Sequence, residues 1–222
     1  MITAKQITIA KAVLFAASLL PFARLVLFTF TDRLGANPIE FITRNTGDWT
    51  LYFLCLTLSV TPLRKLTGMH WLIRLRRMLG LFAFFYATLH FTTFLWFDHF
   101  FDIDEMLKDV VKRPFITVGF TAFVLLIPLA VTSANGMVKR LGGKRWQWLH
   151  RLVYLIAPLG ILHFWWMKAG KNDFAQPILF GSIVAALLLV RLWWNVIQPR
   201  LERRRMSPAP GCGLREQRLE RK

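Results

Sequence analysis

The sequence has few acidic residues and little charge of any kind. Asp and Glu account for 12 of its 222 residues, against 29 Lys and Arg. Charged residues make up 18% of the chain, whereas a soluble domain usually carries about a quarter. Hydrophobic residues make up 55% and the mean hydropathy is +0.43. This apolar excess excludes intrinsic disorder. It also argues against a soluble globular enzyme, because the apolar residues fall in long runs rather than in periodic stripes.

Several motifs are also missing. Two cysteines, Cys55 and Cys212, do not make a disulfide framework, and no C-x-x-C-H motif for covalent haem attachment occurs. The H-E-x-x-H pattern of zinc proteases is absent, and no G-x-G-x-x-G dinucleotide-binding unit follows the last apolar run. The chemistry of this chain therefore has to come from other residues.

The net charge of +17 could suggest a nucleic-acid partner. The basic residues, however, stand in short clusters between the apolar runs, which is typical of a membrane protein oriented by its cationic loops. We therefore expect membrane lipid, and no nucleic acid, as a partner.

Six apolar runs are candidates for membrane-spanning helices, since a bilayer core needs about 20 residues per span. The second is the shortest and most polar. We predict an all-α integral membrane protein, with a six-helix bundle over residues 1–199 and a basic, disordered cytoplasmic tail over residues 200–222. The six runs are Ile7–Phe30, Trp49–Leu63, Leu79–Phe97, Phe115–Thr132, Trp148–Met167 and Phe174–Ile197.

The loops between these runs differ in charge. Lysines and arginines gather before the first run, in Arg64–Arg77, in Ser133–Arg145 and after Pro199, whereas Asp98–Arg113 is acidic. The positive-inside rule then places both termini in the cytoplasm. The Asp98–Arg113 loop lies on the opposite side of the membrane in this topology, either as a solvated loop or as a docking surface for a partner.

Three of the five histidines lie within or at the edge of the predicted spans. They are His90, His150 and His163, whereas His70 and His99 fall in loops, where a solvated position is expected. An ionisable residue inside a membrane is by default a functional candidate. A helix-packing histidine bonded to a neighbouring hydroxyl or carbonyl is the alternative that stays open.

The depths of His90 and His163 along their helices favour a pair of facing histidines. His90 lies thirteen residues beyond Arg77, about 20 Å along its helix at 1.5 Å per residue. His163 lies eighteen residues beyond Arg145, about 27 Å, but only fifteen beyond Trp148, where the buried part starts, which brings it close to the depth of His90. Two neutral imidazoles from facing helices suit a six-coordinate haem iron, and such an iron has no open site and serves electron transfer. His150 lies thirteen residues before His163 and does not share its face in an ideal helix. A second haem there would need another, unidentified ligand.

Four arginines could contact a cofactor. Arg74, Arg76 and Arg77 stand at an inner helix end, where they orient the protein and meet lipid headgroups, or hold haem propionates, a flavin phosphate or a quinone head group. Arg24 lies inside the first span and either extends its side chain to the interface or pairs with a propionate.

The stretch Arg76–His90, RRMLGLFAFFYATLH, resembles the third-helix signature of the MsrQ (YedZ) family, in the ferric-reductase-like transmembrane group. Four further segments are similar to the same family, and together they cover most of the chain up to Arg205. They are ITAKQ at the start, TPLR at Thr61–Arg64, RPFITVG at Arg113–Gly119 and GKRWQWLHRLVYL at Gly143–Leu155.

The resemblance implies one or two b-type haems with His90, His150 and His163 as axial ligands, and FMN as a further cofactor. It implies a haem-binding electron-transfer subunit that takes electrons from the quinone pool or a cytosolic flavin reductase. The acceptor would be MsrP, a periplasmic molybdenum-cofactor enzyme that repairs methionine sulfoxide in proteins. The resemblance also implies that the protein lies in the inner membrane of a bacterium. Larger relatives carry a second histidine where this chain has Arg76, which leaves the number of haems open.

Two other functions stay open. One is a stand-alone cytochrome b that reduces ferric iron or another outer acceptor without a partner. The other is a transporter or structural membrane protein whose histidines serve packing or proton relay, and an absorbance spectrum would separate it from both cytochromes.

Overall fold

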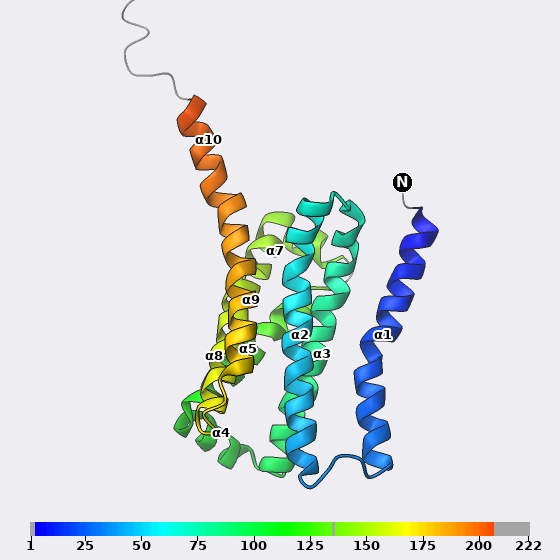
Figure 1. The fold of residues 1–222 in the computed structure, drawn as a ribbon, viewed down its shortest axis with the longest axis vertical. Coiled ribbons are helices and arrows are strands. Elements are labelled where there is room, and N and C mark those ends of the chain that lie inside the picture. The colour runs from blue at the N-terminus through cyan, green and yellow to red at the C-terminus, as the bar shows by residue number, and fades with distance from the viewer. Residues whose placement is uncertain (1–2, 135, 207–222) are drawn as a thin grey trace, which may run out of the picture. The chain divides into compact units, whose positions relative to one another are not determined.

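The computed structural model describes residues 3–134 and 136–206, and within them every regular element is helical (Figure 1). The predicted all-α class is therefore confirmed. The chain divides into two compact units, Met1–Val184 and Ala185–Lys222. The first unit contains all the histidines.

The long helices follow the predicted apolar runs, and shorter elements lie between them. The α-helices are α1 (Ala4–Phe30), α2 (Pro38–Thr67), α3 (Ile73–Thr93), α4 (Ile103–Lys112), α5 (Pro114–Val131), α6 (Met137–Leu141), α7 (Gly143–His150), α8 (Val153–Ala169), α9 (Ala175–Leu192) and α10 (Gln198–Met206). A 3₁₀ turn, η1 (His70–Leu72), precedes α3, and the π-helical turns η2 (Phe94–Asp98) and η3 (Trp193–Ile197) follow α3 and α9.

Five stretches of the described residues are long and apolar enough to cross a membrane. They are Ala4–Phe30, His70–Asp98, Pro114–Val131, Gly143–Ala169 and Ala175–Glu202. Helix α2 is the sixth long helix, and with 30 residues it far exceeds the predicted Trp49–Leu63. It is more polar than the other five because it carries Glu40, Arg44 and Asp48. The count of six spans stays a prediction.

Local sequence signals explain why α2 is so long. The Asn37 side chain accepts a hydrogen bond from the N–H of Glu40, and Pro38 occupies the first turn, where its missing N–H costs nothing. At the other end Gly68 has a φ of 71°, and its N–H bonds to the carbonyl of Arg64. Gly68 thus ends the helix in the left-handed conformation that glycine tolerates best.

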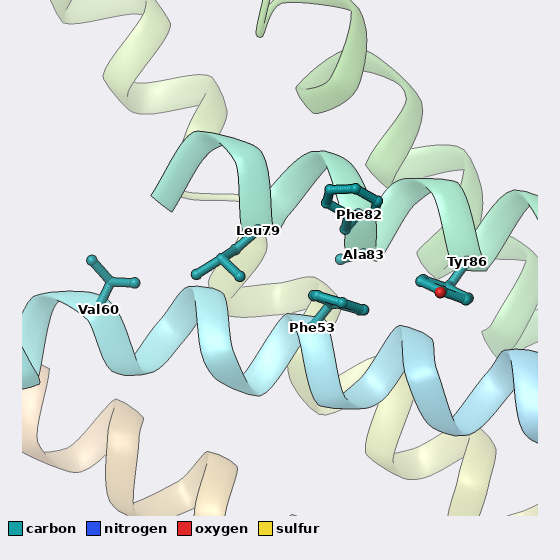
Figure 2. Close-up of a cluster of buried hydrophobic side chains, with 6 residues drawn as sticks. All are labelled: Phe53, Val60, Leu79, Phe82, Ala83 and Tyr86. Atoms are coloured by element: carbon teal, nitrogen blue, oxygen red, sulfur yellow. The ribbon is translucent and has the colours of Figure 1, made fainter. Parts of the chain in front are cut away.

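Helices α2 and α3 pack side by side through a cluster of aromatic and aliphatic side chains. Figure 2 shows Phe53 and Val60 of α2 facing Leu79, Phe82, Ala83 and Tyr86 of α3. The rings of Phe53 and Tyr86 are stacked, with centroids 5.3 Å apart and planes 9° apart. In a membrane the lipid tails are as apolar as these side chains, so close van der Waals packing holds the pair together.

Tyr86 also joins α3 to α1. Its hydroxyl donates to the carbonyl of Ser18 (2.7 Å) and accepts from the N–H of Phe22 (3.2 Å). In a regular helix these two backbone groups would bond to each other, so the hydroxyl is inserted into the α1 hydrogen-bond ladder. Pro21 interrupts the ladder at the same turn because it has no N–H.

Two segments differ from the sequence-based expectation. The fifth run is not one helix, because α7 ends at His150 and α8 begins at Val153. The acidic Asp98–Arg113 segment contains a helix, α4, which Asp102 caps and which buries Met106 and Val110. Its apolar residues recur every four positions, so one face can pack on the protein while the charged residues stay outside.

The second unit comprises the end of α9, η3 and α10. The predicted disordered tail begins at residue 200, but α10 is helical as far as Met206. The division at residue 200 stays a prediction, and residues 207–222 lie outside the described residues.

Candidate cofactor site

His90 lies near the C-terminal end of α3 and bonds to α2. Its Nδ1 is 2.9 Å from the carbonyl oxygen of Thr43. A carbonyl only accepts hydrogen bonds, so Nδ1 carries the proton and donates, and the Nε2 lone pair is left free. The hydrogen bond therefore fixes both the tautomer and the orientation of this ring.

His163 has the same arrangement on another pair of helices. It lies on α8, and its Nδ1 is 2.7 Å from the carbonyl oxygen of Phe115, in the first turn of α5. Here too Nδ1 must be the donor and Nε2 the free nitrogen. Within residues 3–134 and 136–206, no protein group hydrogen-bonds to the Nε2 of either histidine.

The structure brings His90 and His163 together, as their depths predict. The two ring centroids are 6.1 Å apart and the ring planes are 75° apart. Both residues line one cavity of about 1050 Å³ in the first unit, which is at the upper end of the size of cofactor pockets. Two imidazoles with a free nitrogen each thus share a large internal space.

This arrangement fits a metal cofactor that supplies most of its own ligands. Imidazole nitrogens bind metal ions at about 2 Å, so two rings on opposite sides of one ion have centroids about 6 Å apart. In the described part of the chain no three His, Cys, Asp or Glu residues gather into a metal-binding group. Two axial imidazoles are nevertheless enough for the iron of a haem, whose porphyrin provides the other four nitrogens.

The cavity wall is apolar around the rings and polar at one end. Aromatic and small side chains from α3, α5 and α8 form the apolar part, among them Ala87, Phe91, Phe120, Phe123, Ile156 and Gly160. The polar part contains three cationic residues, Arg44, Arg113 and Lys168, which could bind an anionic group. Five acidic residues line the same cavity, namely Glu40, Asp48, Asp98, Glu105 and Asp109. An amphipathic cofactor with a flat apolar body and acidic substituents would match both parts.

Ion pairs hold the polar end together. The Lys168 ammonium is 2.7 Å from the Asp173 carboxylate, and the Lys171 ammonium is 2.9 Å from the Glu40 carboxylate. Glu40 also pairs with Arg44 one turn along α2. The hydrogen bond from Lys171 and the charge of Arg44 lower the pKa of Glu40, and the hydrogen bond and charge of Lys168 lower the pKa of Asp173. Both carboxylates lie outside the five apolar spans and outside the predicted second span, Trp49–Leu63, and both are ionised at neutral pH.

His99 is not a solvated loop residue, which corrects the sequence-based expectation. It is only 5% exposed and lines the same cavity. Its ring packs edge-on against Phe94, with centroids 4.5 Å apart, and its Nε2 lies 3.6 Å from the Asp109 carboxylate. Helix α4, which was not expected, carries Asp109 and covers this side of the ring. His70, in contrast, is exposed as expected.

His150 does not line this cavity. Its Nε2 is 3.1 Å from the hydroxyl of Thr132, and its ring is stacked on Trp146 with centroids 3.9 Å apart. The Trp146 indole donates in turn to the carbonyl of Thr132. The described contacts of His150 are therefore those of a packing histidine.

The four arginines singled out from the sequence also lie away from the cavity. The Arg24 guanidinium stands 4.8 Å from the centroid of the Phe28 ring, on the same helix. Arg74, Arg76 and Arg77 occupy the first turns of α3, whereas His90 lies in its last turn. The cationic residues that line the cavity are instead Arg44, Arg113 and Lys168. Sequence reasoning missed them because a charged residue near a helix end is normally solvated.

Comparison with known proteins identifies the family of this chain. Residues 46–161 match the family model described as ferric reductase like transmembrane component. The protein-methionine-sulfoxide reductase heme-binding subunit MsrQ of Herminiimonas arsenicoxydans is 82% identical over 189 residues, covering 85% of this chain and 87% of the relative. The proteins of the same name from Ralstonia nicotianae and Rhodospirillum rubrum are 60% and 48% identical, covering 87% and 91% of this chain and 89% and 94% of the relatives.

These identities extend over nearly the whole length of each relative, and the family model covers the segment that carries α3, α5 and most of the wall of the cavity. Together with the five apolar helices they establish a multi-pass membrane protein. The chain belongs to the MsrQ family, within the ferric reductase-like transmembrane proteins.

Proposed function

We propose that the protein is a haem b-binding membrane subunit that delivers electrons to a periplasmic molybdenum-cofactor reductase of the MsrP type, for the repair of methionine sulfoxide. The observation that carries the proposal is the His90–His163 pair, because two imidazoles with fixed tautomers face one large cavity at a spacing that suits a shared iron. The printed names of the relatives, which call them heme-binding subunits, agree with it.

The residues of the chain have distinct parts in this proposal. The Nε2 atoms of His90 and His163 would hold the iron, and the carbonyls of Thr43 and Phe115 hold the rings in place. The aromatic wall excludes water, and Arg44 and Arg113 pair with carboxylates at the polar end. When bound there, haem b supplies a one-electron carrier without an open coordination position, which suits electron transfer.

The donor side lies at the other end of α3. Arg74, Arg76 and Arg77 gather there, and guanidinium groups suit a quinone head group or a flavin phosphate. We propose the quinone pool or a cytosolic flavin reductase as the donor and FMN as a further cofactor. His150 remains the candidate ligand for a second haem, for which it would have to exchange its bond to the Thr132 hydroxyl.

The proposal includes a topology with six spans and both termini in the cytoplasm of a bacterium. Helix α2 can serve as a span despite its polarity, because two of its buried hydroxyls bond to carbonyls of the same helix. Thr46 donates to Ile42, and Thr57 donates to Phe53. A membrane tolerates polar groups that are satisfied in this way. Six spans then place every lysine- and arginine-rich loop on one side.

The decisive experiment is an absorbance spectrum and pyridine haemochrome assay of the full-length protein purified from membranes. We expect a b-type Soret band, at least one haem per chain, and reduction of an MsrP-type partner when quinol or a flavin reductase supplies electrons. A protein without a Soret band would instead be a transporter or a structural protein. Reduction of ferric iron at the same rate with and without the partner would favour a stand-alone reductase.

A further inference from the structure

The two histidines of the pair are held by the same local arrangement on two different helices. His90 of α3 bonds to the carbonyl of Thr43 on α2, and Gly47 follows four residues later. His163 of α8 bonds to the carbonyl of Phe115 on α5, and Gly119 follows four residues later. The two helices are unrelated in sequence around these positions, yet the spacing between carbonyl and glycine is identical.

The spacing has a geometric reason. In an α-helix the carbonyl of residue i accepts the N–H of residue i+4. The carbonyls of Thr43 and Phe115 therefore already bond to the N–H groups of Gly47 and Gly119, and each histidine adds a second hydrogen bond to the same oxygen. An imidazole that reaches this oxygen from the side has to lie across the Cα atom of residue i+4. A side chain at that position would occupy the space of the ring.

The distances agree with this account. A Cβ atom added at Gly119 would lie 2.6 Å from Nδ1 and 2.8 Å from Cε1 of His163, which is closer than real Cβ atoms come. One added at Gly47 would lie 3.1 Å from Cε1 and 3.2 Å from Nδ1 of His90. The atom that would have to move is in both cases Nδ1 or its ring neighbour, so the ring cannot retreat without lengthening its hydrogen bond to the carbonyl.

No other property of glycine is used here. Both residues lie inside helices and neither has a positive φ, so any amino acid could adopt their backbone conformation. Glycine weakens a helix interior relative to alanine, so its presence at these two positions needs a local reason. The imidazole rings supply that reason.

We propose that Gly47 and Gly119 are positioning residues for the cofactor ligands. Each glycine, with the carbonyl four residues before it, forms a packing site that fixes the tautomer of one histidine and the plane of its ring. We call them the α2 packing site (Thr43 carbonyl and Gly47) and the α5 packing site (Phe115 carbonyl and Gly119). The inference rests on the proposed haem function, because it assigns the glycines to the two axial ligands.

The two packing sites differ in how much room they leave. A methyl group at Gly47 requires a displacement of a few tenths of an ångström, whereas one at Gly119 cannot be accommodated without moving the ring. Gly119→Ala should therefore disturb His163 more than Gly47→Ala disturbs His90. Loss of a hydrogen-bond partner behind a metal-ligating histidine typically weakens binding about 10- to 100-fold. We expect a loss of this size for Gly119→Ala and a smaller one for Gly47→Ala.

Gly80→Ala is the matched control. Gly80 lies on α3 like His90, does not line the cavity, and a Cβ there would make an ordinary contact of 3.7 Å with the Thr57 methyl group. All four proteins, wild type and the three variants, are purified full-length from membranes. Helix content and thermal melting of the haem-free forms report folding, and haem titration, midpoint potential and the electron paramagnetic resonance spectrum of the ferric form report the ligands.

We expect haem-free Gly47→Ala to melt like haem-free Gly80→Ala, since alanine favours a helix. Haem-free Gly119→Ala should melt lower, because the displaced His163 ring loses its hydrogen bond to the Phe115 carbonyl. With haem, Gly47→Ala should keep six-coordinate iron but shift the low-spin resonance, which is sensitive to the angle between the two imidazole planes, and the midpoint potential. Gly119→Ala should bind haem about 10- to 100-fold more weakly and show a high-spin fraction. Gly80→Ala should match the wild type in every haem measurement.

The proposal is overturned if Gly47→Ala and Gly119→Ala match Gly80→Ala in haem affinity, spin state and potential while the wild type binds haem. Should Gly119→Ala fail to fold, Gly47→Ala decides the question through its resonance and potential. A wild-type protein without haem would contradict the proposed function instead, so the two failures are distinguishable.

Discussion

His90 and His163 differ from His150 in which ring nitrogen the protein occupies. In the pair, a backbone carbonyl takes the Nδ1 proton of each ring and leaves Nε2 free beside the cavity. In His150 the Thr132 hydroxyl occupies Nε2, and Trp146 covers the face of the ring. All three lie in long apolar stretches of the chain. Residue type and depth therefore mark the candidates, and the hydrogen-bond partner separates a free ligand from a packing residue.

The hydrogen-bond partners of His163 and His150 differ because they lie at opposite ends of α5. Phe115 is in its first turn, and its carbonyl reaches His163 because Gly119 leaves room for the ring. Thr132 is the residue that ends the helix, and its hydroxyl also bonds to the carbonyl of Pro128. One end of α5 thus holds an imidazole by its backbone and the other by a side chain.

The largest effect should come from removing one imidazole of the pair. His90→Ala or His163→Ala leaves one axial ligand, so we expect loss of the six-coordinate b-haem spectrum and of donor-driven sulfoxide reduction. His150→Ala, in comparison, should keep the haem of the pair. Pyridine haemochrome quantification of the three variants measures this. A normal haem spectrum in His90→Ala or His163→Ala would contradict the pair, and its loss in His150→Ala alone would reverse the comparison.

A smaller effect is expected for Tyr86→Phe, which tests a third side chain that bonds to a helix carbonyl. Removing the hydroxyl between the carbonyl of Ser18 and the N–H of Phe22 loses two buried hydrogen bonds, which should lower the free energy of unfolding by about 2 kcal/mol. Thermal melting in detergent measures the change, with Tyr52→Phe as the control. Equal melting temperatures for the two variants would show that the Ser18 carbonyl and the Phe22 N–H bond to each other in the variant, with no loss of stability.

Thr132→Val should lower the free energy of unfolding by less, about 1 kcal/mol, because it leaves the Nε2 of the half-buried His150 without its partner. The haem spectrum of the pair should be unchanged, since Thr132 does not line the cavity. Thermal melting and the absorbance spectrum are measured on the same sample. A changed Soret band would show that His150 is itself a ligand whose state the hydroxyl controls.

The smallest effect concerns the polar end of the cavity and depends on pH. Because Lys171 and Arg44 lower the pKa of Glu40, its charged form stabilises the fold above the usual pKa of about 4.5, and this contribution is lost as the pH falls through the lowered value. The melting temperature of Glu40→Gln should be slightly below that of the wild type at pH 7, and the two should be equal at a pH below the lowered pKa of Glu40. A difference that persists in acid would mean that the carboxylate charge is not the cause.

Part of the fold could be predicted because its signals are local. The apolar runs anticipated α1, α3, α5 and α9, and the basic loops suggested an orientation. Helix α2 was expected to be half its length, although Asn37, Pro38 and Gly68 mark its ends in the sequence. The break after His150 has no proline or glycine to signal it, and α4 was hidden in an acidic segment that reads as a loop.

The candidate site divides in the same way. Counting residues from Arg77 and from Trp148 was enough to bring His90 and His163 to similar depth. The same reasoning predicted that His99 is exposed to solvent, whereas the structure shows that it is buried. It also offered no reason to choose Gly47 or Gly119 over the other glycines. These features depend on a neighbouring helix that no local pattern describes.

The amino-acid order by itself determined which segments are apolar enough to enter a bilayer and how far along them each imidazole lies, because thickness and helical rise are measured along one axis. Only the tertiary structure decided which nitrogen of each ring is free. That choice depends on hydrogen bonds between residues that are far apart in the chain, by 47 positions for His90 and by 48 for His163. It therefore depends on how each helix is rotated about its own axis against its neighbour.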